Sequence, residues 1–153
     1  MTYNHMKHNN SDQKILSIIN NYYSNEKSAI KNKLYQLLSH GKLGYTGHLL
    51  ILPVDQGFEH GPLQSFMVNN DAFDPDYHFQ LAIDAGMSAY AAPLGMLQAS
   101  ANKFIGKIPM ILKMNSSNKL NQSRLSPDQA ITASIEDAIE LGCIAIGITI
   151  YPA

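Results

Sequence analysis

The sequence has few of the residues that build disulfide-linked, zinc-bound or nucleic-acid-binding proteins. Its 153 residues include one cysteine, Cys143, one arginine, Arg124, and no tryptophan. A single cysteine excludes an intramolecular disulfide and a multi-cysteine zinc site. Because Cys143 falls in an apolar run, we expect a buried core residue rather than a nucleophile. One arginine and a formal net charge of -1 argue against a nucleic-acid partner.

Long hydrophobic runs are also missing. No stretch approaches the roughly 20 apolar residues of a membrane-spanning helix. The polar segment 1–12 lacks the apolar centre of a signal peptide. We therefore expect a cytoplasmic protein with no membrane partner. An apolar fraction of 45% and a charged fraction of 15% indicate a folded domain rather than a disordered chain.

One segment, 49–62, organises the rest of the chain. It reads LLILPVDQGFEHGP, so an apolar run is followed by Asp55, Gln56, Glu59 and His60. A short continuous apolar run predicts a strand buried on both faces, as in parallel sheets. In α/β folds, functional sites lie at the C-terminal ends of such strands. The polar cluster is therefore the first candidate for chemistry.

Capping residues, prolines and glycines divide the chain into helices and strands. Two amphipathic helices are expected before the first strand, over 11–23 and about 25–40. The elements expected after it are a loop over 63–73, a helix over 75–85, a strand over 88–92, a helix over 94–101, a strand over 109–114, a loop over 115–125, a helix over 127–141 and a strand over 143–150. Strands that alternate with helices indicate a parallel sheet with right-handed crossovers.

The fold class follows from this order and from a missing motif. Neither a G-x-G-x-x-G fingerprint nor a P-loop lysine follows the first strand, which favours a barrel over a dinucleotide-binding fold. A TIM (β/α)8 barrel needs about 200 residues or more. We therefore interpret 48–153 as the first four βα units, the N-terminal half of a TIM barrel, and 1–47 as an N-terminal helical extension.

Three residues end different predicted strands and are the candidate catalytic residues. Asp55 ends the first strand and can accept a proton or orient a hydroxyl group. Lys113, within PMILKMN, either extends out to solvent or points into the barrel mouth as a phosphate or carboxylate contact, and a desolvated lysine can also form a Schiff base. Tyr151 follows the fourth strand, where it can donate a proton or cover the core. In a barrel all three face the same mouth.

The histidines and the second carboxylate of the cluster leave more than one interpretation open. Glu59 and His60 can form a metal pair or an acid/base pair, or can simply hold the loop after the first strand. No second cluster has the spacing of metal ligands, so we expect no metal. His78 lies on a predicted helix and is expected to be a surface or capping residue.

Several motifs together resemble one enzyme family. The segments LPVDQGFEHGP, YHFQLAIDAG, AYAAPLG, IPMILKMN and LGCIAIGITIYP, spread over 49–152, closely resemble the archaeal-type class I fructose-bisphosphate aldolases. The resemblance implies a TIM barrel that forms a homo-oligomer when full length. It also implies reversible cleavage of a sugar phosphate, fructose 1,6-bisphosphate, to dihydroxyacetone phosphate and glyceraldehyde 3-phosphate, with no metal or other cofactor.

The resemblance also suggests roles for individual residues. Asp55 matches the aspartate that handles proton steps, Tyr151 matches the general acid/base, and Lys113 matches a lysine near the substrate. Gln56 and His60 are assigned to substrate binding. The Schiff-base lysine and the phosphate-binding loops are expected on later strands, so the chain is expected to be truncated before that lysine.

Other interpretations remain open. The chain can belong to an aldolase or transaldolase-type enzyme acting on another phosphorylated sugar. It can also be a non-catalytic fragment or a pseudoenzyme. A half barrel leaves two open apolar sheet edges, so we expect it to pair with another copy or another fragment, or to aggregate.

Overall fold

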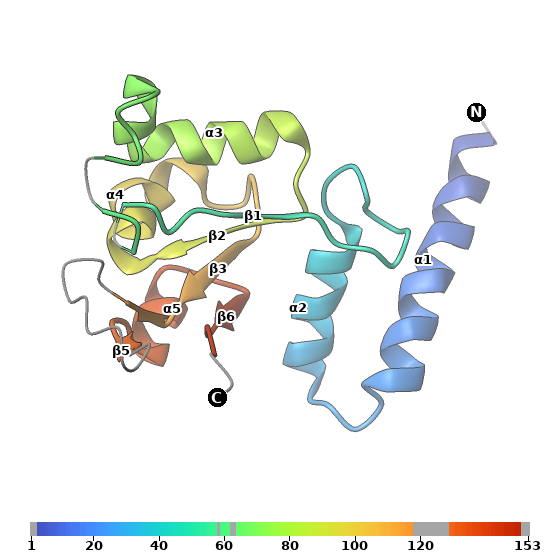
Figure 1. The fold of residues 1–153 in the computed structure, drawn as a ribbon. Helices are drawn as coiled ribbons and strands as arrows, with labels where there is room; N and C mark the ends of the chain where they lie inside the picture. Colours follow the sequence, from blue (N-terminus) through green and yellow to red (C-terminus); the bar gives the residue numbers. More distant parts are fainter. Residues whose placement is uncertain (1–2, 58, 62–63, 118–128, 151–153) are drawn as a thin grey trace.

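The computed structural model describes residues 3–57, 59–61, 64–117 and 129–150, with side chains from Asp12 onward. Helices and strands alternate along most of it (Figure 1). The elements are α1 (Tyr3–Tyr22), α2 (Ser28–Ser39), β1 (Ile51–Pro53), η1 (Asn70–Phe73), α3 (Pro75–Ala85), β2 (Ala89–Pro93), α4 (Leu94–Phe104), β3 (Met110–Lys113), β4 (Asn115–Ser116), β5 (Ala130–Ile131), α5 (Ile135–Glu140) and β6 (Ala145–Gly147).

Four of the strands form one parallel sheet in the order β1-β2-β3-β6. The predicted strands over 88–92 and 109–114 are thus confirmed as β2 and β3. The predicted first and fourth strands are shorter in the structure, three residues each. Sequential parallel strands joined through helices are the expected arrangement of successive βα units.

Helices α3 and α4 cover one face of this sheet (Figure 1). Tyr90 of β2 and Leu112 of β3 project from that face and are fully buried. Phe79 of α3 stacks on Phe104 of α4 with ring centroids 4.8 Å apart, and it meets Tyr90 edge to face at 4.6 Å. The main core therefore lies between the sheet and these two helices.

The opposite face of the sheet is more open. It carries Pro53, Ala91, Ile111 and Lys113, which alternate with the core residues along their strands. The expectation that the first strand is buried on both faces is wrong for this structure, because β1 is an edge strand and Ile51 is 36% exposed. An edge strand lacks a neighbour on one side, so its side chains stay partly in solvent.

Helix α3 begins and ends where the sequence predicts. The Asp74 side chain accepts a hydrogen bond from the Asp76 backbone N–H at 2.9 Å, and Pro75 occupies the first turn. Gly86 ends the helix with φ 69°, a conformation that glycine adopts without strain. The apolar pattern of 75–85 predicts Tyr77, Leu81 and Ala82 on the inward face of this helix. Ala82 is buried, but Leu81 is 40% exposed and His78 is buried instead.

His78 is thus neither at the surface nor a helix cap. Its ring Nε2 lies 2.8 Å from the carbonyl oxygen of Ala72 in η1, and the ring packs beside Phe66. This contact fastens the short helix η1 to α3. A structural role explains the residue, and it lies away from the cluster that follows β1.

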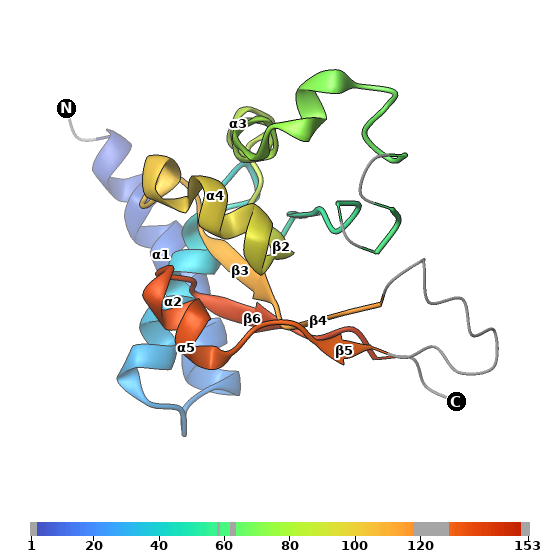
Figure 2. The ribbon, with the colours of Figure 1, turned by 90° about the vertical axis from the view of Figure 1, so that its left-hand side faces the viewer.

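Three other predicted helices start at different places. Helix α1 begins at Tyr3 rather than residue 11, and α2 follows Lys27 rather than residue 24 or 25. The predicted helix over 127–141 is reduced to α5, which Ser134 caps. Ala130 and Ile131, expected on its inward face, instead form β5, antiparallel to β4. Figure 2 shows β4 continuing from β3 beyond the main sheet, with β5 beside it.

The N-terminal helices have a small apolar cluster of their own. It consists of Ile15, Ile19 and Leu38, with Leu34 and Tyr45 packed against it. The division at residues 47 and 48 stays a prediction. Cys143 is half-buried at the edge of the main core, and burial raises the pKa of its thiol to about 11, as expected for a packing residue. In the described chain, no helix is long and apolar enough to span a membrane.

Candidate functional site

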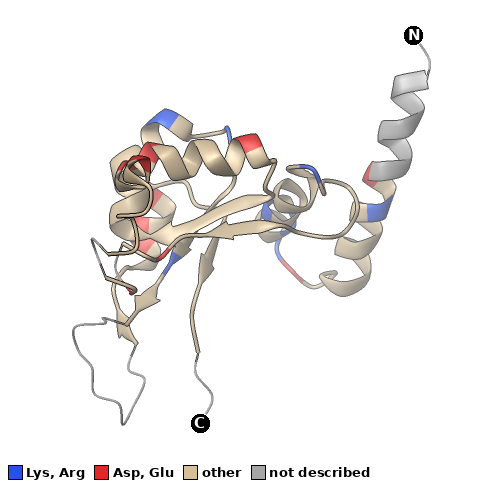
Figure 3. Cartoon of the chain, turned by 45° about the horizontal axis from the view of Figure 1, so that its top comes forward, with Lys and Arg blue, Asp and Glu red and all other residues tan. Residues whose placement is uncertain are grey.

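A cluster of charged side chains lies where β1 and β3 end. Figure 3 shows acidic and basic residues spread mainly over helices and loops, while the strands are largely uncharged. Among the described strands, Lys113 at the end of β3 is the one charged residue. A hollow of about 180 Å³ lies beside it on the open face of the sheet, and its lining includes Pro53, Asp55, Ile111 and Thr149. The sheet thus presents a small concave surface next to the cluster.

Lys113 joins two carboxylates that come from the loop after β1. Its Nζ lies 2.8 Å from Oδ2 of Asp55 and 2.7 Å from Oε1 of Glu59. The lysine side chain is 12% exposed, so it does not extend out to solvent. Burial lowers the pKa of the Lys113 ammonium, but hydrogen bonds and negative charge from both carboxylates outweigh burial. The pKa of Lys113 therefore lies above its ordinary value, and the side chain is an ammonium at neutral pH.

Glu59 is the most enclosed member of the cluster, with a side chain 6% exposed. Besides Lys113, its Oε1 accepts hydrogen bonds from the Ser117 backbone N–H at 3.0 Å and from Gln129 Nε2 at 3.1 Å. Burial raises the pKa of the Glu59 carboxyl, but the hydrogen bonds from these three donors outweigh it and hold that pKa below its ordinary value. Glu59 is therefore a buried carboxylate whose Oε1 is contacted by three donors.

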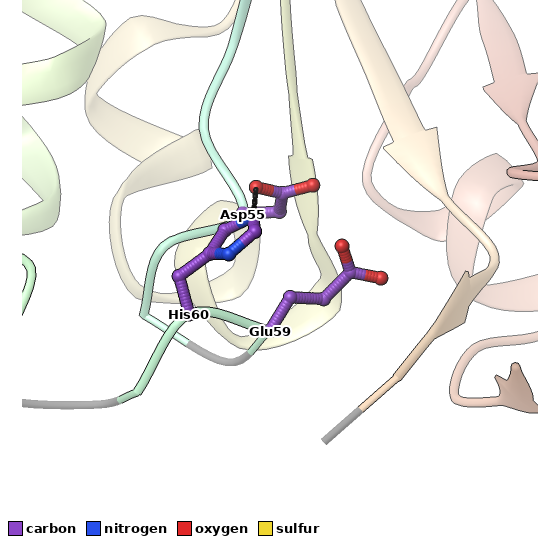
Figure 4. A group of neighbouring side chains, drawn as sticks. All are labelled: Asp55, Glu59 and His60. Carbon is purple, nitrogen blue, oxygen red and sulfur yellow. Dashed lines mark ion pairs between the residues drawn. The ribbon is translucent and has the colours of Figure 1, made fainter. Parts of the chain in front are cut away.

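The two residues assigned to substrate binding lie on the same loop but differ in position. His60 is 61% exposed, and its Nε2 is 3.6 Å from Oδ1 of Asp55. Figure 4 shows the imidazole beside the Asp55 carboxylate, with the Glu59 carboxylate pointing to the same side. Gln56 instead folds back, and its Oε1 accepts a hydrogen bond from the Asp55 backbone N–H at 3.1 Å. The substrate contacts of both residues stay predictions.

The cluster offers three groups of the type that bind metal ions. Ligand atoms of Asp55, Glu59 and His60 lie within 4.8 Å of one another. However, the Lys113 ammonium already contacts both carboxylates at 2.7–2.8 Å, where a bound cation would lie. A metal would have to displace this ammonium or lie close to it, and like charges repel. The donor set therefore fits an internal lysine better than a metal ion.

Of the three predicted catalytic residues, the structure brings Asp55 and Lys113 into contact. Tyr151 lies outside the described residues, so its place at the mouth stays a prediction. Two residues earlier, Thr149 is held by Asn115, whose Nδ2 donates to the Thr149 carbonyl oxygen and whose Oδ1 accepts from the Thr149 N–H, both at 2.8 Å. This pair of bonds fixes the backbone after β6 against the end of β3.

Sequence reasoning missed the partners that surround the cluster. The sequence predicts a polar loop for Asn115 and Ser117 and the first turns of a helix for Gln129. Asn115 directly follows the third predicted strand with a polar group, the same signal that identifies Asp55, so its position could have been found. Gln129 carries no such signal, because its contact with Glu59 depends on the β4–β5 pairing.

Comparison with known proteins places the chain in a family. A sequence model of the DeoC/LacD family aldolases matches residues 49–153. The chain is 40% identical over 128 residues to a protein of Chlamydia muridarum named probable fructose-bisphosphate aldolase class 1, covering 84% of this chain and 36% of that protein. It is 39% identical over 106 residues to fructose-bisphosphate aldolase class 1 of Thermoproteus tenax, covering 69% and 38%.

Solved structures agree with these sequence matches. An archaeal fructose 1,6-bisphosphate aldolase superposes with a TM-score of 0.62 at 37% identity, covering 76% of this chain and 43% of that one. A Schiff-base-forming fructose-1,6-bisphosphate aldolase gives 0.62 at 35% identity, covering 76% and 44%. The chain thus spans less than half the length of these relatives, and its sheet corresponds to part of an aldolase barrel. The predicted fold class and the resemblance are confirmed, and the chain belongs to the DeoC/LacD family of aldolases.

Proposed function

We propose that this chain forms part of a class I fructose-bisphosphate aldolase, which cleaves fructose 1,6-bisphosphate reversibly to dihydroxyacetone phosphate and glyceraldehyde 3-phosphate without a metal. The observation that carries the proposal is the contact between Asp55 and Lys113 at the strand ends of an aldolase-family sheet. The names of the relatives point to the same substrate.

Asp55 is suited to the proton steps of such a reaction. Cleavage of the C3–C4 bond requires a base to accept the proton of the C4 hydroxyl while the bonding electrons move toward an iminium group. The Asp55 carboxylate is 27% exposed and borders the hollow on the open face of the sheet, so a substrate hydroxyl can reach it. Tyr151, two residues after Thr149 of the same hollow, remains the proposed second proton donor.

Lys113 is suited to act as a fixed positive charge rather than as the amine that attacks the substrate. A Schiff base forms from a neutral amine, whereas two carboxylates keep Lys113 protonated. We therefore assign the imine to a lysine other than Lys113, in agreement with the expectation of a Schiff-base lysine on a later strand. The ammonium of Lys113 holds and orients the Asp55 carboxylate through their contact at 2.8 Å.

The test uses the chain extended through the later barrel strands, because the Schiff-base lysine is expected there. It combines cleavage of fructose 1,6-bisphosphate with borohydride trapping and peptide mass mapping. We expect metal-independent activity, loss of most activity in Asp55→Asn, and no reduced adduct on Lys113. Complete inhibition by EDTA would contradict the lysine mechanism. Absence of cleavage and of any adduct on the extended chain would refute the proposal and favour a pseudoenzyme. Cleavage of a different sugar phosphate alone would favour the alternative substrate.

We further propose that the full-length protein is a homo-oligomer, as the resemblance implies. In the described chain, apolar residues at or beside the two edge strands of the sheet are exposed: Ile51 is 36% exposed, Ile146 43% and Ile148 57%. Another copy or the remaining strands of a barrel can cover such apolar edges. Light scattering over a range of protein concentrations would test this, and a monomer at all of them would contradict it. The cytoplasmic location stays a prediction.

A further inference from the structure

Glu59 has an arrangement that the proposed chemistry does not by itself require. One of its carboxylate oxygens, Oε1, contacts three donors from three parts of the chain. Lys113 comes from the end of β3, the Ser117 N–H from the residue after β4, and Gln129 from the residue before β5. A buried carboxylate is costly unless it is paired, and these three contacts together favour the ionised form of Glu59.

The loop after β1 places Glu59 at this point. The Glu59 N–H donates to the carbonyl oxygen of Asp55 at 2.9 Å, which closes a single turn between the two residues. The turn brings the carboxylates of Asp55 and Glu59 to the same side of the loop (Figure 4). Lys113 therefore meets one carboxylate that borders the hollow, Asp55, and one that is enclosed by protein, Glu59.

The two carboxylates that contact the Lys113 ammonium differ in their exposure to solvent. Asp55 is 27% exposed and Glu59 6%, so Glu59 holds Lys113 from the protein side. Without Glu59, Asp55 would be the one carboxylate of this pair left to contact the Lys113 ammonium, and the lysine side chain could move together with Asp55. A carboxylate that forms a close ion pair with an ammonium is a weaker base, because a proton and the ammonium compete for the same oxygen atoms.

We propose that Glu59 is a positioning residue that fixes Lys113 in place and in its charged form. Through Ser117 and Gln129, Glu59 also links the β4–β5 hairpin to the same ammonium. Glu59 acts through Lys113 and Asp55 and does not touch the substrate. The inference rests on the proposed function for its effect on catalysis. The charge and position of Lys113 can be measured without any activity.

The first measurement is the pKa of Lys113 by NMR on the purified chain with ¹³C-labelled lysine. Glu59→Gln keeps the size of the side chain and one acceptor oxygen but removes the charge. We expect the pKa of Lys113 to fall in Glu59→Gln. The matched control is Asp76→Asn, which removes the partner of Lys103 in an ion pair between α3 and α4 and should leave the Lys113 signal unchanged.

A second variant separates the charge of Glu59 from its tie to the hairpin. Gln129→Ala removes one donor to Glu59 and keeps the charge pair with Lys113. We expect the pKa of Lys113 to stay above its ordinary value, while amide hydrogen exchange at Ser116 and Ser117 becomes faster. Faster exchange in Gln129→Ala with an unchanged lysine pKa supports the two separate roles. Unchanged exchange overturns the tie to the hairpin.

Kinetics then test the consequence for catalysis. We expect kcat of Glu59→Gln to fall on the order of 10- to 100-fold with little change in KM, because misplacement of a reacting group affects the chemical step. An unchanged Lys113 pKa in Glu59→Gln overturns the positioning role. A lowered pKa with unchanged kcat overturns its importance for catalysis. A lowered pKa in a chain whose wild type lacks aldolase activity supports the placement of Lys113 and refutes only the proposed function.

Discussion

Asn115 links the ends of β3 and β6 through two hydrogen bonds, in the way that a backbone peptide group would. Its side chain is enclosed, with the residue 4% exposed, and both bonds to the Thr149 backbone are 2.8 Å long. Asn115→Ala removes both partners of Thr149. At about 1 kcal/mol for each hydrogen bond, plus part of the cost of unsatisfied groups, we expect the free energy of unfolding to fall by about 2–4 kcal/mol. That is a large part of the usual stability of about 5–15 kcal/mol.

A second substitution tests the reasoning more sharply. Asn115→Asp keeps the shape of the side chain and the oxygen that accepts from the Thr149 N–H. It replaces the amide nitrogen that donates to the Thr149 carbonyl oxygen by a carboxylate oxygen, so two oxygen atoms then face each other. This contact disfavours the charged form, so the new carboxyl should have a raised pKa in the folded protein. The destabilisation is then full at pH 7 and shrinks as the pH falls through that pKa, because the protonated acid can donate again.

Urea unfolding followed by circular dichroism at pH 7 and pH 4 measures both effects. The control is Asn21→Ala on the exposed side of α1. The Asn21 side chain donates a hydrogen bond to Ser17 Oγ at 3.2 Å, and its removal should change stability by less than about 0.5 kcal/mol. A loss below about 0.5 kcal/mol in Asn115→Ala would refute the argument. So would an Asn115→Asp variant whose deficit does not shrink at pH 4.

Three further predictions concern the charge cluster and the packing. Lys113→Met leaves Asp55 and Glu59 without their shared ammonium and should cost about 3 kcal/mol at pH 7 in urea unfolding; equal stability to wild type would contradict the pairing. Because the pKa of Glu59 is lowered, its contribution to stability is present above about pH 4.3 and is lost as the pH falls through the folded pKa. The difference in unfolding free energy between wild type and Glu59→Gln should therefore narrow between pH 6 and pH 2. Ser134→Ala removes the cap of α5 and should cost about 1 kcal/mol, whereas Ser134→Asn should cost less.

Local signals predicted the middle of the fold well. The boundaries of α3 follow from Asp74, Pro75 and Gly86, which act on the backbone within a few residues of themselves. The start of α5 was misplaced although a local signal existed: Ser134 and Asp137 form a capping box within the predicted helix. The expected start comes instead from the cap-plus-proline segment Ser126-Pro127-Asp128, and the apolar residues that follow it fit a helical stripe.

Properties that depend on distant parts of the chain were not predictable in this way. The exposure of β1 depends on its place at the sheet edge, which strand order alone reveals. The inward face of α3 was misjudged because Phe79 packs on Phe104 and His78 bonds to Ala72, and neither partner is marked by periodicity. By contrast, the meeting of Asp55 with Lys113 was foreseeable, because the C-terminal ends of parallel strands share one edge of the sheet.

The sequence leaves two contacts open for Lys113, a phosphate or a carboxylate. The charges of Asp55, Glu59 and Lys113 together favour one of them. Asp55 and Glu59 carry two formal negative charges against the one positive charge of Lys113, so these three side chains have a formal net charge of -1. Such a cluster repels a phosphate group, and the ammonium is already bound to two carboxylates. In the described structure Lys113 is therefore a carboxylate contact, and we predict that it makes no contact with a substrate phosphate. If the substrate is a sugar bisphosphate, its hydroxyl-bearing carbons belong beside Asp55, and its phosphates must lie away from this cluster.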